Sequence, residues 1–156
     1  MVECRRPEVQ ELTAQKAVVC ALFEDVLKTN FPYAETVSEK AEESYSSLIR
    51  YAEDGSAIIY CVFQENVIVG LLWAYRRSFM GALRIHVDEF VVSPACRGKG
   101  FGRLLMDSLE KDAAAEKITE IDLLVSASSE SGVAFYQRNG FVNERFWMKK
   151  NVRYQE

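Results

Sequence analysis

The chain has 156 residues, of which 49% are hydrophobic and 27% charged, and its formal net charge is −4. This composition excludes disordered and fibrous proteins, and the length suffices for one domain with a hydrophobic core but not for two ordinary ones. The acidic balance argues against a nucleic-acid-binding role, which needs a basic face. We therefore expect a single globular domain over residues 1–156.

The sequence shows no sign of membrane targeting or of metal binding. No stretch stays apolar for the length of a membrane span, and the N-terminal MVECRRPEVQ lacks the apolar core of a signal peptide. We therefore expect a cytoplasmic protein with no membrane partner. The four cysteines are widely spaced, and His86 is the single histidine. This pattern favours neither a zinc site nor a disulfide framework, so no metal is expected.

The first half of the chain is predicted to contain one strand, two helices and a hairpin. Thr36 and Glu39 have the spacing of a capping box at the start of the second helix. The hairpin strands are rich in β-branched and aromatic residues and are joined by the tight turn Gln64-Glu65-Asn66. The predicted elements are a strand at 2–6, helices at about 7–30 and 36–52, and strands at 57–63 and 67–75.

The second half alternates strands with helices after an exit loop at 76–81. The predicted elements are a strand at 83–92, a helix at about 100–115, a strand at 118–125, a short helix ending at Asn139-Gly140, and a last strand at 141–150. The order predicts a mixed α/β arrangement with an antiparallel first half. Where the sheet changes direction, a cleft opens at strand ends, and ligands tend to bind there. Trp73 and Trp147 lie on predicted strands and are expected in the core.

A glycine-rich basic turn follows the strand at 83–92. The stretch from His86 to Gly102 reads HVDEFVVSPACRGKGFG, and an apolar helical pattern begins directly after it. Glycines at alternate positions let backbone N–H groups crowd together at a helix N-terminus, where the helix dipole favours anions. Basic side chains add to the attraction at Arg97, Lys99 and Arg103. The pattern predicts a phosphate cradle, and the alternative is a tight strand-to-helix turn that happens to be basic.

Two separate motifs carry a family resemblance. Arg97-Gly98-Lys99-Gly100-Phe101-Gly102 matches the Arg/Gln-x-x-Gly-x-Gly/Ala signature of the GNAT superfamily of acyl-CoA-dependent N-acetyltransferases. Phe90-Val91-Val92-Ser93-Pro94 resembles that family's fourth strand, and Ala134 to Phe141 resembles its closing helix. The resemblance implies an α/β (α+β) fold of GNAT type. It has a mixed central sheet of about six to seven strands flanked by about four helices, antiparallel in its first half and splayed at the acyl-CoA site.

The same resemblance implies which residues hold acetyl-CoA, the expected co-substrate. The loop from Arg97 to Arg103 would bind the pyrophosphate through backbone N–H groups and basic side chains. The backbone of Phe90, Val91 and Val92 would run beside the pantetheine like an added strand and point an N–H at the thioester oxygen. Ser129 stands where the family often has an asparagine that contacts the cofactor arm, and it can cap the closing helix. The cofactor-binding residues expected from the loop are Arg97, Gly98, Lys99, Gly100, Phe101, Gly102 and Arg103.

Acetyl transfer to an amine also needs a base and an acid. An alkyl amine with a pKa near ~10.4 is protonated at neutral pH, so a carboxylate must take its proton. Asp88 and Glu89 are the two candidates, and strand alternation allows only one of them to face the cleft unless a bulge intervenes. Tyr136, by its match to the family motif, would protonate the leaving thiolate. The alternative is that both carboxylates are structural or charge-pairing residues, with solvent or no group as the base, and that Tyr136 is a core aromatic.

The sequence therefore predicts an N-acetyltransferase domain that moves the acetyl group of acetyl-CoA to a primary amine by direct attack in a ternary complex. A non-catalytic acyl-CoA-binding sensor or regulatory module on the same fold is the alternative. The acceptor is a small-molecule or peptide amine that the motifs do not identify, because the fold resemblance concerns the donor and loops shape the acceptor site. The exposed last strand makes a homodimer a reasonable expectation.

Overall fold

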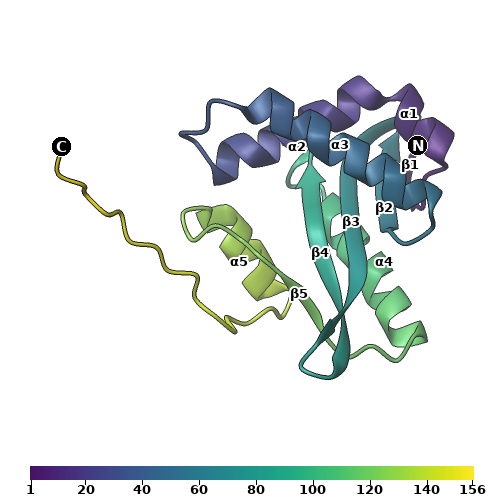
Figure 1. Cartoon of the computed structure of the whole chain (residues 1–156). Helices are drawn as coiled ribbons and strands as arrows, with labels where there is room; N and C mark the ends of the chain where they lie inside the picture. The colour runs from purple at the N-terminus through teal and green to yellow at the C-terminus, as the bar shows by residue number, and fades with distance from the viewer.

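The computed structural model describes all residues 1–156 and confirms a mixed α/β fold (Figure 1). One sheet has the strand order β1-β2-β3-β4-β5. The strands are β1 Val2–Arg5, β2 Ile58–Gln64, β3 Val67–Phe79, β4 Ala82–Val92 and β5 Ile121–Leu123. The helices are α1 Val9–Ala14, α2 Lys16–Asn30, α3 Val37–Glu53, α4 Phe101–Ala115 and α5 Glu130–Arg138, with a 3₁₀ turn at Pro94–Cys96.

Helices cover both faces of the sheet, which explains why the central strands are apolar at nearly every position. On β2, Ile59 and Phe63 join the core cluster formed with α2 and α3, whereas Ile58 and Val62 join the cluster formed with α4. Figure 1 shows the same arrangement, with α1, α2 and α3 on one side of the sheet and α4 on the other. The sheet is therefore the middle layer of a three-layer domain.

The sheet opens beside the end of β4. Strands β1 to β4 are antiparallel neighbours, whereas β5 runs parallel to β4. The parallel pairing stops at Val87 and Leu123, so the last five residues of β4, 88–92, have a strand partner only on the β3 side. This confirms the predicted change of direction and the predicted splay, and it leaves backbone groups of β4 free to pair with a ligand.

The first predicted helix is two helices, α1 and α2, separated at Gln15. Gln15 has the non-helical angles φ −109° and ψ 29°. Its side-chain amide donates to the Asn66 carbonyl (3.0 Å) and its side-chain oxygen accepts from the Ile68 N–H (2.9 Å). These two bonds tie the break to the β2–β3 turn, so a contact distant in sequence interrupts the helical pattern.

The predicted exit loop at 76–81 is wrong, because β3 continues to Phe79 and a turn at Met80-Gly81 leads directly into β4. The charged residues that suggested a loop are paired on the strand. Arg76 binds Glu116 and Arg77 binds Asp122 (2.6 Å). The capping box at Thr36 is not formed either, since its side chain makes no capping hydrogen bond.

The predicted last strand at 141–150 is also wrong. Residues 141–156 form no strand, so the sheet has five strands in place of six or seven. The domain has five α-helices in place of about four. Figure 1 shows this segment leaving the body of the molecule as an extended chain. A strand needs a neighbour for its backbone hydrogen bonds, and after Phe141 the segment makes no backbone hydrogen bond within its own chain. Trp147 is accordingly 86% exposed, whereas Trp73 is buried as expected.

Candidate active site

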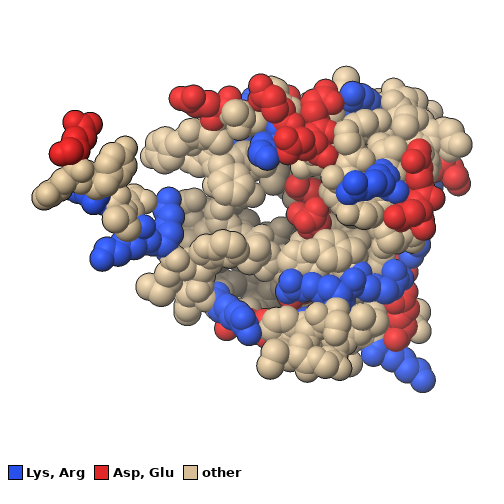
Figure 2. Space-filling view, in the orientation of Figure 1, with Lys and Arg blue, Asp and Glu red and all other residues tan.

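A cavity of about 540 Å³ lies where α2, the end of β4, the glycine-rich loop and α5 meet. Figure 2 shows this side of the molecule hollowed between the upper helical layer and the region of α5. Ten of the eleven residues predicted to bind the cofactor line it, and Lys99 does not. The ten are Phe90, Val91, Val92, Arg97, Gly98, Gly100, Phe101, Gly102, Arg103 and Ser129. The structure thus brings together residues that lie about 40 positions apart in the sequence.

The glycine-rich loop ends at the N-terminus of α4. Gly98 and Gly100 have φ values of 77° and 82°, a left-handed conformation that residues with a Cβ adopt at a cost. The first backbone bond of the helix runs from the Leu104 N–H to the Gly100 carbonyl (3.2 Å). The three preceding N–H groups of the first turn therefore have no carbonyl partner in the helix, and they lie beside the cavity at the positive end of the helix dipole.

Two of the three basic side chains of the loop, Arg97 and Arg103, already have partners. Arg97 binds the Asp25 carboxylate of α2 and donates through Nε to the Val92 carbonyl (3.2 Å). Arg103 binds Asp107 (2.7 Å) and donates to Asn139 (3.1 Å). These contacts orient both guanidinium groups at the cavity, but they also offset part of the positive charge, so the backbone N–H groups are the main free donors for an anion.

Aromatic rings close the inner end of the cavity. The ring centroid of Phe90 lies 5.4 Å from that of Phe135 and 5.8 Å from that of Tyr136. Tyr136 in turn packs against Phe141 at 5.5 Å. Gly102 makes this packing possible, because a Cβ at that position would lie 3.1 Å from Phe135 Cζ. The cluster holds α5 against the end of β4 and thereby places the Tyr136 phenol at the junction.

Ser129 stands at the N-cap position of α5 and lines the cavity, but its side chain makes no capping hydrogen bond. The predicted cap is therefore not formed. A Cβ on Gly132 would lie 2.8 Å from Ser129 Oγ. Position 132 therefore has no room for a side chain while Ser129 keeps this conformation.

The two candidate bases line a second, smaller cavity of about 160 Å³, which Tyr136 shares. Glu89 is paired with Trp73 and Val87 with Ala74, so Asp88 is the extra residue of a β-bulge. The bulge interrupts the strand alternation, and both carboxylates line the cavity although alternation allowed only one. The remaining lining is largely apolar and comes from α2, the residue after it, β4, and β5 with the residue after it: Val26, Leu27, Asn30, Phe31, Val87, Phe90, Leu123 and Leu124.

The surroundings of these groups favour their neutral forms. Burial, and then the charge of Asp88, raises the pKa of Glu89 to about 8. Burial also raises the pKa of Asp88, which is the more exposed of the two side chains. Burial, followed by the charge of Glu89, raises the pKa of Tyr136 to about 12. A carboxyl that titrates near neutral pH therefore lies in the same cavity as a phenol that stays protonated.

His86 is close in sequence to these carboxylates but takes no part in either cavity. It is buried, its Nδ1 is 2.7 Å from Asp122 Oδ1, and its ring lies 5.3 Å from that of Tyr75. No group of three or more His, Cys, Asp or Glu side chains is placed to hold a metal ion.

The sequence reading missed the contribution of α2. Asp25, Val26, Thr29 and Asn30 line the larger cavity from the last turns of this helix. Their spacing of one, four and five residues puts them on one helical face, which is a detectable signal. The sequence pattern predicts this helix but not where its C-terminal turns lie relative to the strand ends.

Comparison with known proteins identifies a family for most of the chain. Residues 21–141 match the model of the acetyltransferase (GNAT) family. The uncharacterized N-acetyltransferase YdgE of Bacillus subtilis is 26% identical over 116 residues, which cover 73% of this chain and 74% of YdgE. The chain has no helix that is both long and apolar enough to cross a membrane.

Solved structures show the same fold at low sequence identity. A GCN5-related N-acetyltransferase from Ralstonia eutropha is 20% identical, with a TM-score of 0.79 over 97% of this chain and 99% of that chain. An acetyltransferase from Clostridium acetobutylicum, solved with acetyl-CoA, is 16% identical, with a TM-score of 0.74 over 97% of this chain and 96% of that one.

Proposed function

The chain belongs to the acetyltransferase (GNAT) family, and we propose that it transfers the acetyl group of acetyl-CoA to a primary amine. The observation that carries the proposal is the junction at the end of β4. A strand edge without a partner, a helix N-terminus with free N–H groups, and the Glu89 and Tyr136 side chains all meet there. These are the parts that a direct attack in a ternary complex requires.

The larger cavity suits the donor. Free N–H groups of the first turn of α4 would bind the pyrophosphate, with Arg97 and Arg103 at its edge. Backbone groups of residues 90–92 on the open side of β4 would pair with the amides of the pantetheine arm of acetyl-CoA. They would also hold an N–H near the thioester oxygen, where negative charge develops during attack. Bound acetyl-CoA supplies the activated acetyl group.

Of the two carboxylates, Glu89 is the better base. A pKa of about 8 is close to a working pH, so the ionised form is populated and its affinity for a proton is high. Asp88 is more exposed and occupies the bulge, and its charge helps to raise the pKa of Glu89. We assign the proton transfer to Glu89 and a tuning effect to Asp88.

The steps balance without further reagents. The amine binds as an ammonium ion, and Glu89 takes its first proton. The free nitrogen then attacks the thioester carbon, and the carbonyl oxygen takes the negative charge. When the carbon–sulfur bond breaks, Tyr136 gives its proton to the thiolate and regains one from the acylated nitrogen, and Glu89 releases its proton to solvent. The pKa of about 12 keeps the phenol protonated until that step. The products are the acetamide and free CoA.

The lining of the smaller cavity supports a proposal for the kind of amine. It contains two carboxylates, an apolar lining from α2 and β5, and no lysine or arginine. Figure 2 shows further acidic side chains gathered at the top of the molecule over α3. A cationic amine on an apolar body fits this setting, whereas a carboxylate or phosphate close to the amine would be repelled.

The proposal is tested by measuring thiol release from acetyl-CoA with a panel of amines. Alkyl and arylalkyl amines without a second charged group, and polyamines, are expected to react. Amino acids and amino sugar phosphates of similar size, which carry a negative charge near the amine, are expected to react poorly. Tyr136→Phe serves as the control for background hydrolysis. Binding of CoA without turnover on any amine would instead favour an acyl-CoA-binding sensor.

A further inference from the structure

Trp73 on β3 carries a buried hydrogen-bond donor without a partner. Its side chain is 4% exposed, and its indole Nε1 makes no hydrogen bond within the chain. The indole nitrogen donates a hydrogen bond and accepts none, and a buried tryptophan usually gives this hydrogen to an acceptor. The acceptor has to come from the groups next to Trp73 on its face of the sheet.

The positions around Trp73 offer one carboxylate. Ile59 of β2 stands opposite Trp73 on one side, and Glu89 of β4 stands opposite it on the other. Ile59 is apolar, and so is Leu71, which precedes Trp73 on the same face of β3. Directly opposite residues of an antiparallel pair have Cβ atoms about 5 Å apart, so the side chain of Glu89 is long enough to reach the indole.

Core packing places both side chains on the face of the sheet that α2 and α3 cover. Trp73 belongs to the core cluster on that face, and so does Val91, two residues after Glu89. Glu89 lines the smaller cavity together with Val26 and Leu27 of α2, which pack against the same cluster. The unpartnered indole and the proposed base are therefore neighbours on one face.

Glu89 lacks a hydrogen-bond partner as well. Its carboxyl faces the smaller cavity and forms no hydrogen bond or ion pair within the chain. The titratable groups that face it are Asp88, beside it on β4, and the Tyr136 phenol from α5. Helix α2 and strand β5 present no charged side chain to this cavity. No group other than the indole is thus placed as a donor to ionised Glu89 from the strand opposite.

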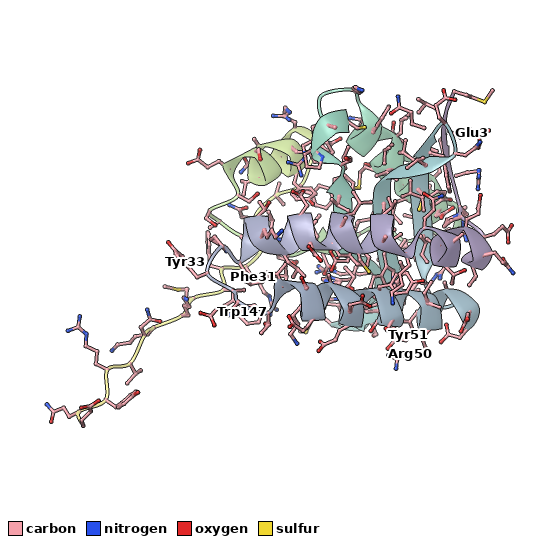
Figure 3. The ribbon with its side chains drawn as sticks, turned by 90° about the horizontal axis from the view of Figure 1, so that it is seen from above. Glu3, Phe31, Tyr33, Arg50, Tyr51 and Trp147 are labelled. Carbon is pink, nitrogen blue, oxygen red and sulfur yellow. The ribbon has the colours of Figure 1, made fainter.

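The aromatic neighbour of Trp73 on α3 already has a hydrogen-bond partner. The ring centroid of Tyr51 lies 6.3 Å from that of Trp73. The Tyr51 hydroxyl accepts from Arg50 Nη2 (2.9 Å), and both residues lie next to each other on α3 (Figure 3). Tyr51 therefore packs against the indole and holds its ring on the sheet, while Glu89 remains the acceptor.

We propose that Trp73 is a positioning residue of the active site, whose indole N–H donates to the Glu89 carboxylate when that group is ionised. A hydrogen bond to an anion is shorter and stronger than one to a neutral acid, so it favours ionised Glu89 and fixes the direction in which the carboxylate faces the cavity. The consequence for catalysis rests on the proposed function, in which Glu89 is the base, whereas the hydrogen bond itself can be observed without substrate.

The test follows the indole N–H signals by nuclear magnetic resonance between pH 6 and 9.5. Trp73 and Trp147 are the two tryptophans of the chain, and Trp147→Phe assigns the signals, because Trp147 is 86% exposed. The Trp73 signal is expected to move downfield as Glu89 ionises, and the Trp147 signal to stay constant. In Glu89→Gln the Trp73 signal should not titrate. In the matched control Asp88→Asn it should keep its full change with a midpoint at lower pH, because the Asp88 charge helps to raise the pKa of Glu89.

Activity measurements then test the consequence for catalysis. Trp73→Phe keeps an aromatic ring and removes the donor, so the midpoint of the pH profile of kcat/KM for the amine should rise by about one unit. The loss should be roughly tenfold at pH 7 and less than about twofold at pH 9.5, with KM for acetyl-CoA unchanged. A purely structural role would lower activity by the same factor at every pH. Trp147→Phe is expected to keep the wild-type profile.

Two results would overturn the role of Trp73: an indole signal that does not titrate or titrates alike in Glu89→Gln, and a Trp73→Phe profile parallel to that of the wild type. The first needs no substitution of Trp73, so it decides the matter even where Trp73→Phe fails to fold. A titrating signal in a protein that acetylates no amine would support the hydrogen bond and count against the proposed function.

Discussion

Substituting Glu89 by glutamine removes the proposed base while keeping the size of the side chain. An alkyl amine of pKa ~10.4 is unprotonated in roughly one molecule in 2,500 at pH 7 and one in 25 at pH 9. The variant must wait for this fraction, whereas the wild type deprotonates the bound ammonium. With a pKa of about 8, Glu89 is ionised in roughly a tenth of the molecules at pH 7 and nine tenths at pH 9.

General-base catalysis contributes about 100-fold or more, so a loss in kcat/KM of about 100-fold or more is expected at pH 7. The fractions above set its pH dependence, and the loss should be roughly tenfold smaller at pH 9. The assay is thiol release from acetyl-CoA at saturating donor between pH 6 and 9.5. Asp88→Asn is the matched control. Because the Asp88 charge helps to raise the pKa of Glu89, its removal should move the midpoint of the pH profile to lower pH and leave most of the activity. A Glu89→Gln profile parallel to that of the wild type, with a loss below about threefold at pH 7, would refute the assignment.

Three further outcomes follow from the site. Tyr136→Phe should lower kcat by about 100-fold and leave CoA affinity, measured by calorimetry, unchanged, since only the proton of the phenol is lost. Gly102→Ala should lower the free energy of unfolding by about 1–3 kcal/mol in a urea titration, because its Cβ would lie 3.1 Å from Phe135 Cζ. In the control Gly98→Ala, the Cβ meets no atom within 4 Å, so the free energy of unfolding should fall only by the ~1 kcal/mol of a left-handed alanine. Between the ordinary pKa of 4.5 and the raised value of about 8, the folded state holds the Glu89 proton and the unfolded state has lost it. Stability should therefore fall as pH rises through this window, by up to about 1.4 kcal/mol per pH unit, and Glu89→Gln should flatten the slope.

Much of the fold was predictable because it depends on local pattern. The helical spacing after Gly100 and the β-branched runs before it identified α4 and the central strands within a few residues. Errors arose where a distant residue intervened. Gln15 breaks a helix because its side chain bonds the β2–β3 turn, and Arg77 stays on a strand because Asp122, far along the chain, pairs with it.

The candidate site also has parts that local sequence predicted and parts that only the tertiary structure revealed. The glycine-rich loop was recognisable from its spacing, and the Tyr136 helix from its resemblance to the closing motif of the family, since each motif is contiguous. The bulge at Asp88 and the lining supplied by α2 were not, because they depend on strand register and on where a helix ends over the sheet. The choice between the two carboxylates therefore came from burial and not from sequence.

By itself the sequence determined which residues form the glycine-rich turn before α4, because left-handed glycines and an amphipathic helix act over a few neighbouring residues. Only the tertiary structure decided the conformation of the segment after Phe141. The alternation of residues 142–154 is that of a strand, but a strand exists only where another backbone accepts its hydrogen bonds. In this chain the sheet ends at β5, so the same pattern becomes an exposed tail.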